Sequence, residues 1–233
     1  MIAGIQKLTL LDFPGRTACT VFLAGCNYRC PFCHNAELFS GKPEEVMTED
    51  EFFNFLQSRK GLLDGVCVSG GEPTLTPGLE AFLSQIKALG FAVKLDTNGS
   101  RPAVLKVLAQ KGLLDYVAMD VKSSPGGYAA ATGVAADLAA VEESLRFLID
   151  SHLPYELRTT LVAQLHNEER IASMGRWLAS LVPGKKPRQL FLQSFVDRDT
   201  VVYGGLCAPE ENAVMQYKDI LIEFVTNVTI RNT

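Results

Sequence analysis

Short apolar runs rich in β-branched residues alternate with amphipathic segments along most of this 233-residue chain. The runs are nearly continuous rather than alternately apolar and polar, which is typical of strands buried on both faces of a parallel sheet. Six strand–helix alternations predict one α/β domain over residues 1–233. The strands are expected at Thr17–Ala24, Gly65–Ser69, Ala92–Asp96, Tyr116–Val121, Tyr155–Val162 and Gln189–Gln193.

The amphipathic segments between these runs predict the helices. Thr48 and Glu51 have capping-box spacing at the start of the first helix. Thr76 followed by Pro77 indicates the start of the second helix. A short extra strand is expected at Asn227–Arg231. The helices are expected at Thr48–Arg59, 76–90, Arg101–Gln110, Asp137–Asp150, Asn167–Leu181 and from near Pro209 onward.

Charge and hydropathy disfavour several classes of protein. The formal net charge of −4 argues against broad electrostatic binding of nucleic acid or of anionic membrane surfaces. No apolar run approaches the roughly 20 residues that a membrane-spanning helix needs. Residues 1–12 lack the basic and then apolar pattern of a secretory signal. We therefore expect a cytoplasmic protein that binds neither nucleic acid nor membrane.

Polar and glycine-rich segments follow the carboxyl ends of four predicted strands. Parallel α/β architectures place their active sites at that edge of the sheet. Any strand needs a polar turn, but four such segments in series favour a functional edge. They are Gly25–Asn35, Gly70–Pro73, Asp96–Gly99 and Asp120–Lys122.

The cysteines Cys26, Cys30 and Cys33 lie in one short segment with C-x3-C-x2-C spacing. In a reducing compartment such a cluster indicates a metal rather than a disulfide. Cysteine thiolates hold iron–sulfur clusters, and three ligands to a cubane leave one iron open for a substrate. The other cysteines have apolar surroundings and are expected to be buried small hydrophobes: Cys19, Cys67 and Cys207.

A structural zinc site is the alternative that the spacing leaves open. His34 could be its fourth ligand, although the adjacent Cys33 and His34 would have difficulty reaching one tetrahedral ion together. A distant His152, His166 or Cys207 could serve instead.

With Phe32 before Cys33, the segment has the C-x3-C-x-aromatic-C pattern of the radical S-adenosylmethionine (SAM) superfamily. Gly70–Pro73 resembles the GGEP segment of that superfamily. The resemblance spans nearly the whole chain. It implies a partial (βα)6 barrel of the radical SAM type with a parallel sheet, and a [4Fe–4S] cluster and SAM as cofactors. The implied cluster ligands are Cys26, Cys30 and Cys33.

Within the superfamily, the sequence most resembles the activating enzymes of glycyl radical proteins. Asp12–Arg16 is similar to their D-G-P-G-x-R segment, and Phe13, where glycine is usual, fits the activators of anaerobic ribonucleotide reductase. The C-H-N, D-T-N-G and D-x-K segments of these enzymes are matched by Cys33–Asn35, Asp96–Gly99 and Asp120–Lys122.

This resemblance implies an iron–sulfur oxidoreductase of class EC 1.97.1.- that cleaves SAM reductively to a 5′-deoxyadenosyl radical. The radical would take a hydrogen atom from a glycine of a partner enzyme. Anaerobic ribonucleotide reductase is the first candidate partner and pyruvate formate-lyase the second. A flavodoxin or a ferredoxin would donate the electron.

The resemblance also implies roles for individual residues. Asp120 and Lys122 would face the cofactor and the glycyl peptide as catalytic residues, and Asp96 with Thr97 would help to bind a monovalent cation. Cofactor binding is implied for Phe32, Gly70, Gly71, Glu72, Asp96, Asn98, Asp120, Arg158 and Gln193.

Each polar residue of this set also has an ordinary structural interpretation. Asp96 and Asn98 are favoured in turns. Asp120 and Lys122 share one side of a strand and could form an ion pair.

The later strands leave similar alternatives. Arg158 lies among apolar residues and needs an anionic partner, either the cofactor carboxylate or Glu156. Gln193 could bind the cofactor or cap its strand. His34 is interpreted as polar support rather than as a metal ligand.

Two other functions are left open by the sequence. One is a radical SAM enzyme with a small-molecule substrate, such as 7-carboxy-7-deazaguanine synthase. The other is a non-catalytic protein with a structural zinc. The C-H-N, D-T-N-G and D-x-K segments favour the activating enzyme.

Overall fold

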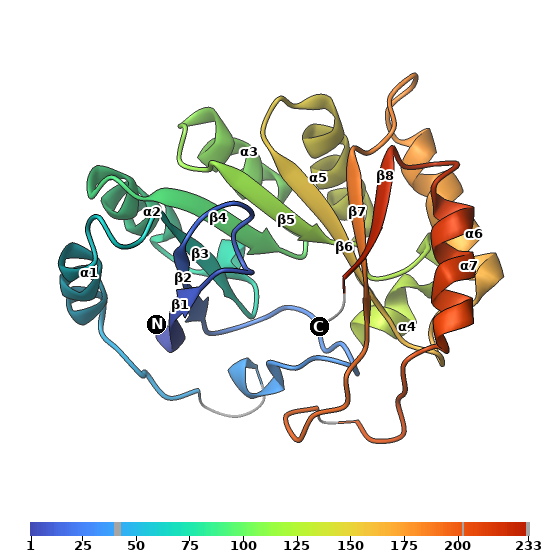
Figure 1. The fold of residues 1–233 in the computed structure, drawn as a ribbon, viewed down its shortest axis with the longest axis horizontal. Coiled ribbons are helices and arrows are strands. Elements are labelled where there is room, and N and C mark those ends of the chain that lie inside the picture. The colour runs from blue at the N-terminus through green and yellow to red at the C-terminus, as the bar shows by residue number, and fades with distance from the viewer. Residues whose placement is uncertain (40–42, 202, 232–233) are drawn as a thin grey trace. The chain divides into compact units, whose positions relative to one another are not determined.

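The computed structural model describes residues 1–39, 43–201 and 203–231 (Figure 1). Strands and helices alternate along the chain, which confirms the predicted α/β fold with a mostly parallel sheet. The contacts divide the chain into two compact units: the first unit comprises residues 1–27, 37–97 and 103–118, and the second unit comprises residues 28–36, 98–102 and 119–233. The single domain and the partial closure of a barrel stay predictions.

The first unit contains β1 (Ile2–Thr9), β2 (Ala18–Leu23), β3 (Gly65–Gly70) and β4 (Ala92–Thr97). β2, β3 and β4 pair in parallel in chain order, and β1 pairs antiparallel with β2. The sequence did not predict β1. The helices of the first unit are α1 (Glu49–Ser58), α2 (Leu79–Ala88) and all but the first residue of α3 (Pro102–Gln110).

The strand β5 (Tyr116–Asp120) begins in the first unit and ends in the second. The second unit continues with β6 (Tyr155–Leu161), β7 (Gln189–Ser194) and β8 (Asn227–Arg231), which pair in parallel in this order. β8 has the bounds that the sequence predicts. The helices are α4 (Tyr128–Thr132), α5 (Leu138–Asp150), α6 (Glu168–Ser180) and α7 (Glu211–Leu221), of which α6 and α7 pack side by side (Figure 1).

Helix starts follow the capping residues, with one correction. The Thr48 side chain and Glu51 form a complete capping box at α1. The predicted start of α2 at Thr76 is wrong, because Gly78 is the N-cap residue and the helix begins at Leu79. The short helix α4 was also not predicted; it begins at Tyr128, directly after a segment where Ser124, Pro125 and two glycines indicate a loop.

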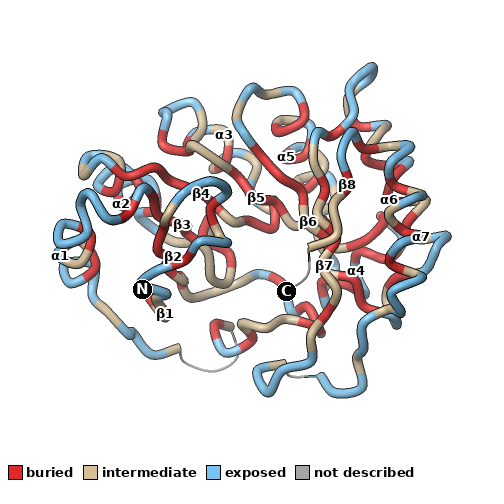
Figure 2. Tube along the Cα trace, viewed as in Figure 1, coloured by how far each residue is buried: buried red, intermediate tan, exposed pale blue. Residues whose placement is uncertain are grey.

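Buried residues are concentrated on the strands and on one side of each longer helix (Figure 2). In the first unit, Phe52 of α1 stacks on Phe82 of α2 with ring centroids 5.4 Å apart. In the second unit, Tyr128 of α4 contacts Trp177 of α6 edge-on at 6.1 Å. These aromatic contacts join helices that are distant in sequence within the same unit.

Phe13 has a structural role in the first unit. Its side chain is 2% exposed and packs against Ala18, Ala92 and Tyr116. Gly65 makes room for the ring, because a Cβ atom on Gly65 would lie 2.9 Å from Phe13 Cε1. The residue that departs from the D-G-P-G-x-R pattern therefore fills the space at the amino ends of β2, β3 and β4.

Replacing Phe13 by alanine should lower the free energy of unfolding by about 3–5 kcal/mol, because the ring leaves a cavity at a buried site. Denaturant unfolding measures this change. Leu11→Ala is the control: Leu11 is 84% exposed, so its loss should change stability by about 0.5 kcal/mol or less. Similar small effects of both substitutions would contradict the packing role of Phe13.

Candidate active site

Gly70 and Gly71 pack directly against the start of the cysteine segment in the first unit. The Gly71 N–H donates to the Leu23 carbonyl at 2.9 Å, and the Glu72 N–H donates to the Gly25 carbonyl at 2.7 Å. A Cβ atom on Gly71 would lie 2.1 Å from the Gly25 oxygen. Gly70 has a φ of 125° and would bring a Cβ to 2.3 Å from the Leu23 oxygen. Both positions therefore require glycine.

Glu72 is completely buried in the first unit. Its Oε1 accepts hydrogen bonds from the Thr74 N–H at 3.1 Å, the Thr74 hydroxyl at 2.5 Å and the Thr97 hydroxyl at 2.7 Å. A buried carboxylate is stable only with such partners. Glu72 thus ties the end of β3 to the end of β4 and holds the glycine turn in place. The sequence did not indicate that Thr74 and Thr97 supply these bonds.

A buried cation accompanies Asp96. The Lys94 side chain is completely buried, and its Nζ bonds to the Asp96 carboxylate and lies 3.5 Å from Cys67 Sγ. The sequence analysis missed Lys94. The sequence does contain a signal for this ion pair, namely a lysine inside the apolar run Ala92–Leu95. A buried ammonium needs an anionic partner, and Asp96 follows two residues later on the same side of the strand.

Cys30 and Cys33 belong to the segment that forms part of the second unit. The Cys33 N–H donates to the Cys30 carbonyl at 3.1 Å in a tight turn, and the Arg29 N–H donates to the Thr132 carbonyl of α4 at 2.7 Å. Cys30 is buried and Cys33 is half-buried. Burial raises the pKa of the Cys33 thiol, while the backbone of Asn35 opposes that shift.

Asp120 and Lys122 form the ion pair that the sequence suggests, with Lys122 Nζ 2.6 Å from Asp120 Oδ2. The same Nζ lies 5.9 Å from the centroid of the Phe32 ring, within reach of a cation–π contact. Burial by itself would lower the pKa of Lys122, but the Asp120 carboxylate and the cysteine sulfurs of Cys30 and Cys33 raise it above its ordinary value. Lys122 is therefore a cation beside the cysteine segment.

Asn98 forms the predicted turn. It is buried, and its Oδ1 accepts a hydrogen bond from the Ser100 N–H at 2.9 Å. The next residue, Gly99, has a φ of 75° and would bring a Cβ to 1.9 Å from Met119 Cε. The left-handed φ explains why glycine ends the D-T-N-G segment, since the Met119 side chain is flexible and could move aside.

Arg158 has the anionic neighbour that its half-buried position requires. Its guanidinium lies 2.5 Å from Glu156 Oε1, and Glu156 is completely buried. Arg231 of β8 also approaches Glu156, at 3.3 Å. Gln193 lies next to Arg231 in the register of β7 and β8 and is half-buried. Roles of Arg158 and Gln193 in cofactor binding stay predictions.

The remaining cysteines follow the sequence analysis in part. Cys19 and Cys67 are buried, as expected. The prediction for Cys207 is wrong: it is exposed, in the connection between β7 and α7, and its Sγ lies 3.2 Å from Gln164 Nε2. The sequence around Cys207 lacks the continuous apolar run that surrounds the other two.

His34 acts as polar support. Its Nε2 lies 2.7 Å from the Val196 carbonyl, and its ring stacks on Phe195 with centroids 5.7 Å apart.

Among residues 1–39, 43–201 and 203–231, no three His, Cys, Asp or Glu side chains are placed to hold one metal ion. Ligands of a cubane bind separate irons, so three cysteine thiols within eight residues still fit that cofactor.

No helix in the described part of the chain combines the length and the apolar character needed to cross a membrane.

Residues 20–178 match the family model described as the Radical SAM superfamily. The chain belongs to this superfamily. Membership confirms the resemblance seen in the cysteine and GGEP segments and makes the chain an enzyme of the radical SAM class. A [4Fe–4S] cluster and SAM are the cofactors of that class. The individual residues that bind them stay predictions.

Relatives agree with this assignment. A protein of Methanocaldococcus jannaschii named as a glycyl-radical enzyme activating enzyme is 31% identical, over 99% of this chain and 95% of its own. A 7-carboxy-7-deazaguanine synthase of Thermococcus kodakarensis is 27% identical, over 74% of this chain and 73% of its own. The crystal structure of Streptococcus suis SuiB bound to its precursor peptide SuiA shares the fold, with a TM-score of 0.70, 12% identity, and coverage of 91% of this chain and 48% of SuiB.

Proposed function

We propose that this enzyme generates a glycyl radical on a partner protein. The likeness to an activating enzyme over nearly its entire length is the observation that carries the proposal. Likeness to the 7-carboxy-7-deazaguanine synthase covers about three quarters of each chain and leaves the rest unaccounted for. Anaerobic ribonucleotide reductase is the first candidate partner because Phe13 fits its activators, and pyruvate formate-lyase is the second.

In this proposal Cys26, Cys30 and Cys33 would hold the [4Fe–4S] cluster. The turn between Cys30 and Cys33 already brings these two residues close in the backbone. When bound, the cluster and SAM supply the one-electron cleavage that produces the hydrogen-abstracting radical. A flavodoxin or a ferredoxin would supply the electron.

The remaining residues bind and orient. The Gly70–Gly71 backbone, held by Glu72, would contact the methionine part of SAM without a side chain in the way. The other residues proposed to complete the cofactor site are Phe32, Asp96, Asn98, Arg158 and Gln193. Positioning of a reactant is the main contribution that a protein makes to such chemistry.

Asp120 and Lys122 would seat the glycyl peptide. The pair presents a carboxylate and an ammonium next to Phe32 and the cysteine segment. Groups of both signs can bond to peptide N–H and C=O groups, so an extended backbone suits this pair. Glycine is an apt target because it has no side chain to hinder approach.

The proposal is tested by incubating the reconstituted, reduced enzyme with SAM and each candidate partner. A glycyl radical doublet in the electron paramagnetic resonance spectrum of the partner is expected, together with 5′-deoxyadenosine release. Turnover of a purine-like or pterin-like substrate with no doublet on either partner would instead support a small-molecule enzyme.

A further inference from the structure

His166 is a buried histidine that the proposed chemistry leaves without a role. It is 3% exposed and follows β6 in a tight turn, in which its N–H donates to the Val162 carbonyl at 2.9 Å. The hydroxyl of Tyr217 on α7 donates to the His166 carbonyl at 3.1 Å. The backbone of His166 is thus held on both sides, so its imidazole ring has a defined position.

The two ring nitrogens of His166 join different segments of the second unit. Nδ1 lies 3.1 Å from the Val162 nitrogen and 3.2 Å from the Val162 oxygen. Nε2 lies 3.1 Å from the carbonyl oxygen of Lys122. The ring therefore bridges the end of β6 and the residue that carries the proposed peptide-seating ammonium.

The contacts select one tautomer of His166. The buried Val162 N–H needs an acceptor, and Nδ1 can accept only when it carries no proton. The proton is then on Nε2, which donates to the Lys122 carbonyl. The opposite tautomer would set a nitrogen lone pair against that oxygen. Burial lowers the pKa of His166, which favours the neutral ring.

Lys122 lies just after β5, where the chain separates from the neighbouring strand β6. The preceding residue, Val121, is still attached to that strand: its N–H donates to the Arg158 carbonyl at 2.8 Å, and its carbonyl accepts from the Thr159 hydroxyl at 2.9 Å. The next carbonyl, that of Lys122, is bonded to His166. The direction in which the Lys122 side chain leaves the backbone therefore depends on His166.

We propose that His166 is a positioning residue, whose Nε2–H bond to the Lys122 carbonyl sets the orientation of the Asp120–Lys122 pair toward a peptide substrate. This inference rests on the proposed function, because it concerns the seating of the partner's glycyl peptide. It makes no demand on cluster binding or on SAM cleavage.

The experiment compares two substitutions that keep different halves of the imidazole contact. In His166→Asn, the amide oxygen can accept from Val162 but the side chain is too short to reach Lys122. In His166→Gln, the longer amide can donate to Lys122. The ratio of glycyl radical on the partner to 5′-deoxyadenosine released is measured for each, with thermal unfolding. Both products come from the same folded enzyme, so the ratio does not depend on how much of it is active.

His166→Asn should lower the ratio by about tenfold, because small misplacements of a reactant have large effects on rate. His166→Gln should restore most of the wild-type ratio. If His166→Asn does not fold, 3-(4-thiazolyl)alanine at position 166 replaces it, since this residue keeps the Nδ1 acceptor and has sulfur in place of Nε2–H. It should lower the ratio in the same way.

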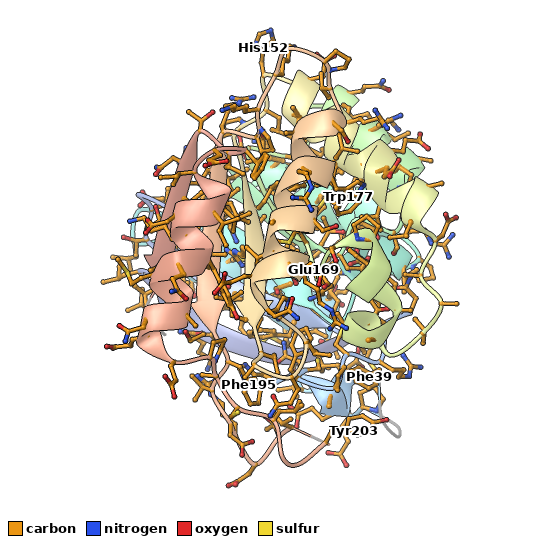
Figure 3. The ribbon with its side chains drawn as sticks, turned by 90° about the vertical axis from the view of Figure 1, so that its right-hand side faces the viewer. Phe39, His152, Glu169, Trp177, Phe195 and Tyr203 are labelled. Carbon is orange, nitrogen blue, oxygen red and sulfur yellow. The ribbon has the colours of Figure 1, made fainter. Side chains whose placement is uncertain are left out.

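A wild-type ratio in His166→Asn, or in the thiazolyl variant, would overturn the inference. So would equal ratios in the asparagine and glutamine variants. Absence of the doublet with the wild-type enzyme and every partner would instead count against the proposed function. His152→Asn is the matched control, because His152 is exposed at the tip of the connection between α5 and β6 (Figure 3), and it should leave the ratio unchanged.

Discussion

Replacing Cys26, Cys30 or Cys33 by alanine should abolish the release of 5′-deoxyadenosine from SAM. Each thiolate is proposed to ligate one iron, and a cluster that has lost one of three protein ligands is not held in a defined place. Iron and sulfide content, the broad brown absorbance of the reconstituted protein and chromatography of the products measure the loss. The effect should be complete, rather than a partial decrease in rate.

Cys19→Ala and Cys67→Ala are the controls for these variants. Both residues are buried, so their loss should lower stability by about 1–2 kcal/mol and leave SAM cleavage intact. Cys207→Ser changes an exposed residue and should alter neither property. If two of the three clustered cysteines prove dispensable for SAM cleavage, the ligand assignment is wrong.

Asp120→Ala or Lys122→Ala should reduce glycyl radical formation on the partner about tenfold more than it reduces uncoupled SAM cleavage. The reason is that the pair is proposed to seat the peptide, whereas cleavage needs only the cofactors. Measuring 5′-deoxyadenosine and the radical doublet on one sample of each variant gives the comparison.

Lys87→Ala is the matched control, because Lys87 and Asp115 form an ion pair of similar length, 2.7 Å, in the first unit. A partly exposed pair of this kind contributes up to about 1 kcal/mol. Its loss should affect both readouts little and equally. An equal decrease of cleavage and radical formation in the Asp120 and Lys122 variants would show that this pair has only a structural role.

Most of the fold could be predicted from the sequence because burial and helix capping leave local patterns in the residues of each segment. β8 and the capping box at Thr48 are examples, since both depend on neighbouring residues. β1 was missed because three of its residues, 6–8, are exposed, so it has no continuous apolar run. The start of α2 was misplaced because Thr76–Pro77 forms a turn, and the helix begins only after the N-cap residue Gly78.

Only those residues of the candidate site that belong to contiguous sequence motifs could be predicted. The cysteine, GGEP and D-x-K segments show which residues matter, but not what holds them. Thr97 reaches Glu72 from another strand, and His166 bonds to a backbone atom of Lys122 that any residue would supply. Such partners leave no local pattern, because they depend on how distant segments pack.

The ion pair of Lys94 and Asp96 affects how the charge at the carboxyl end of β4 depends on salt concentration. A dissolved cation that balances a carboxylate occupies its place by mass action, so its effect varies with concentration. The ammonium of Lys94 is part of the chain and completely buried, so it can neither be diluted away nor readily exchanged for sodium or potassium. The positive charge that Lys94 brings to the Asp96 carboxylate is therefore supplied by the chain itself and does not depend on the salt concentration.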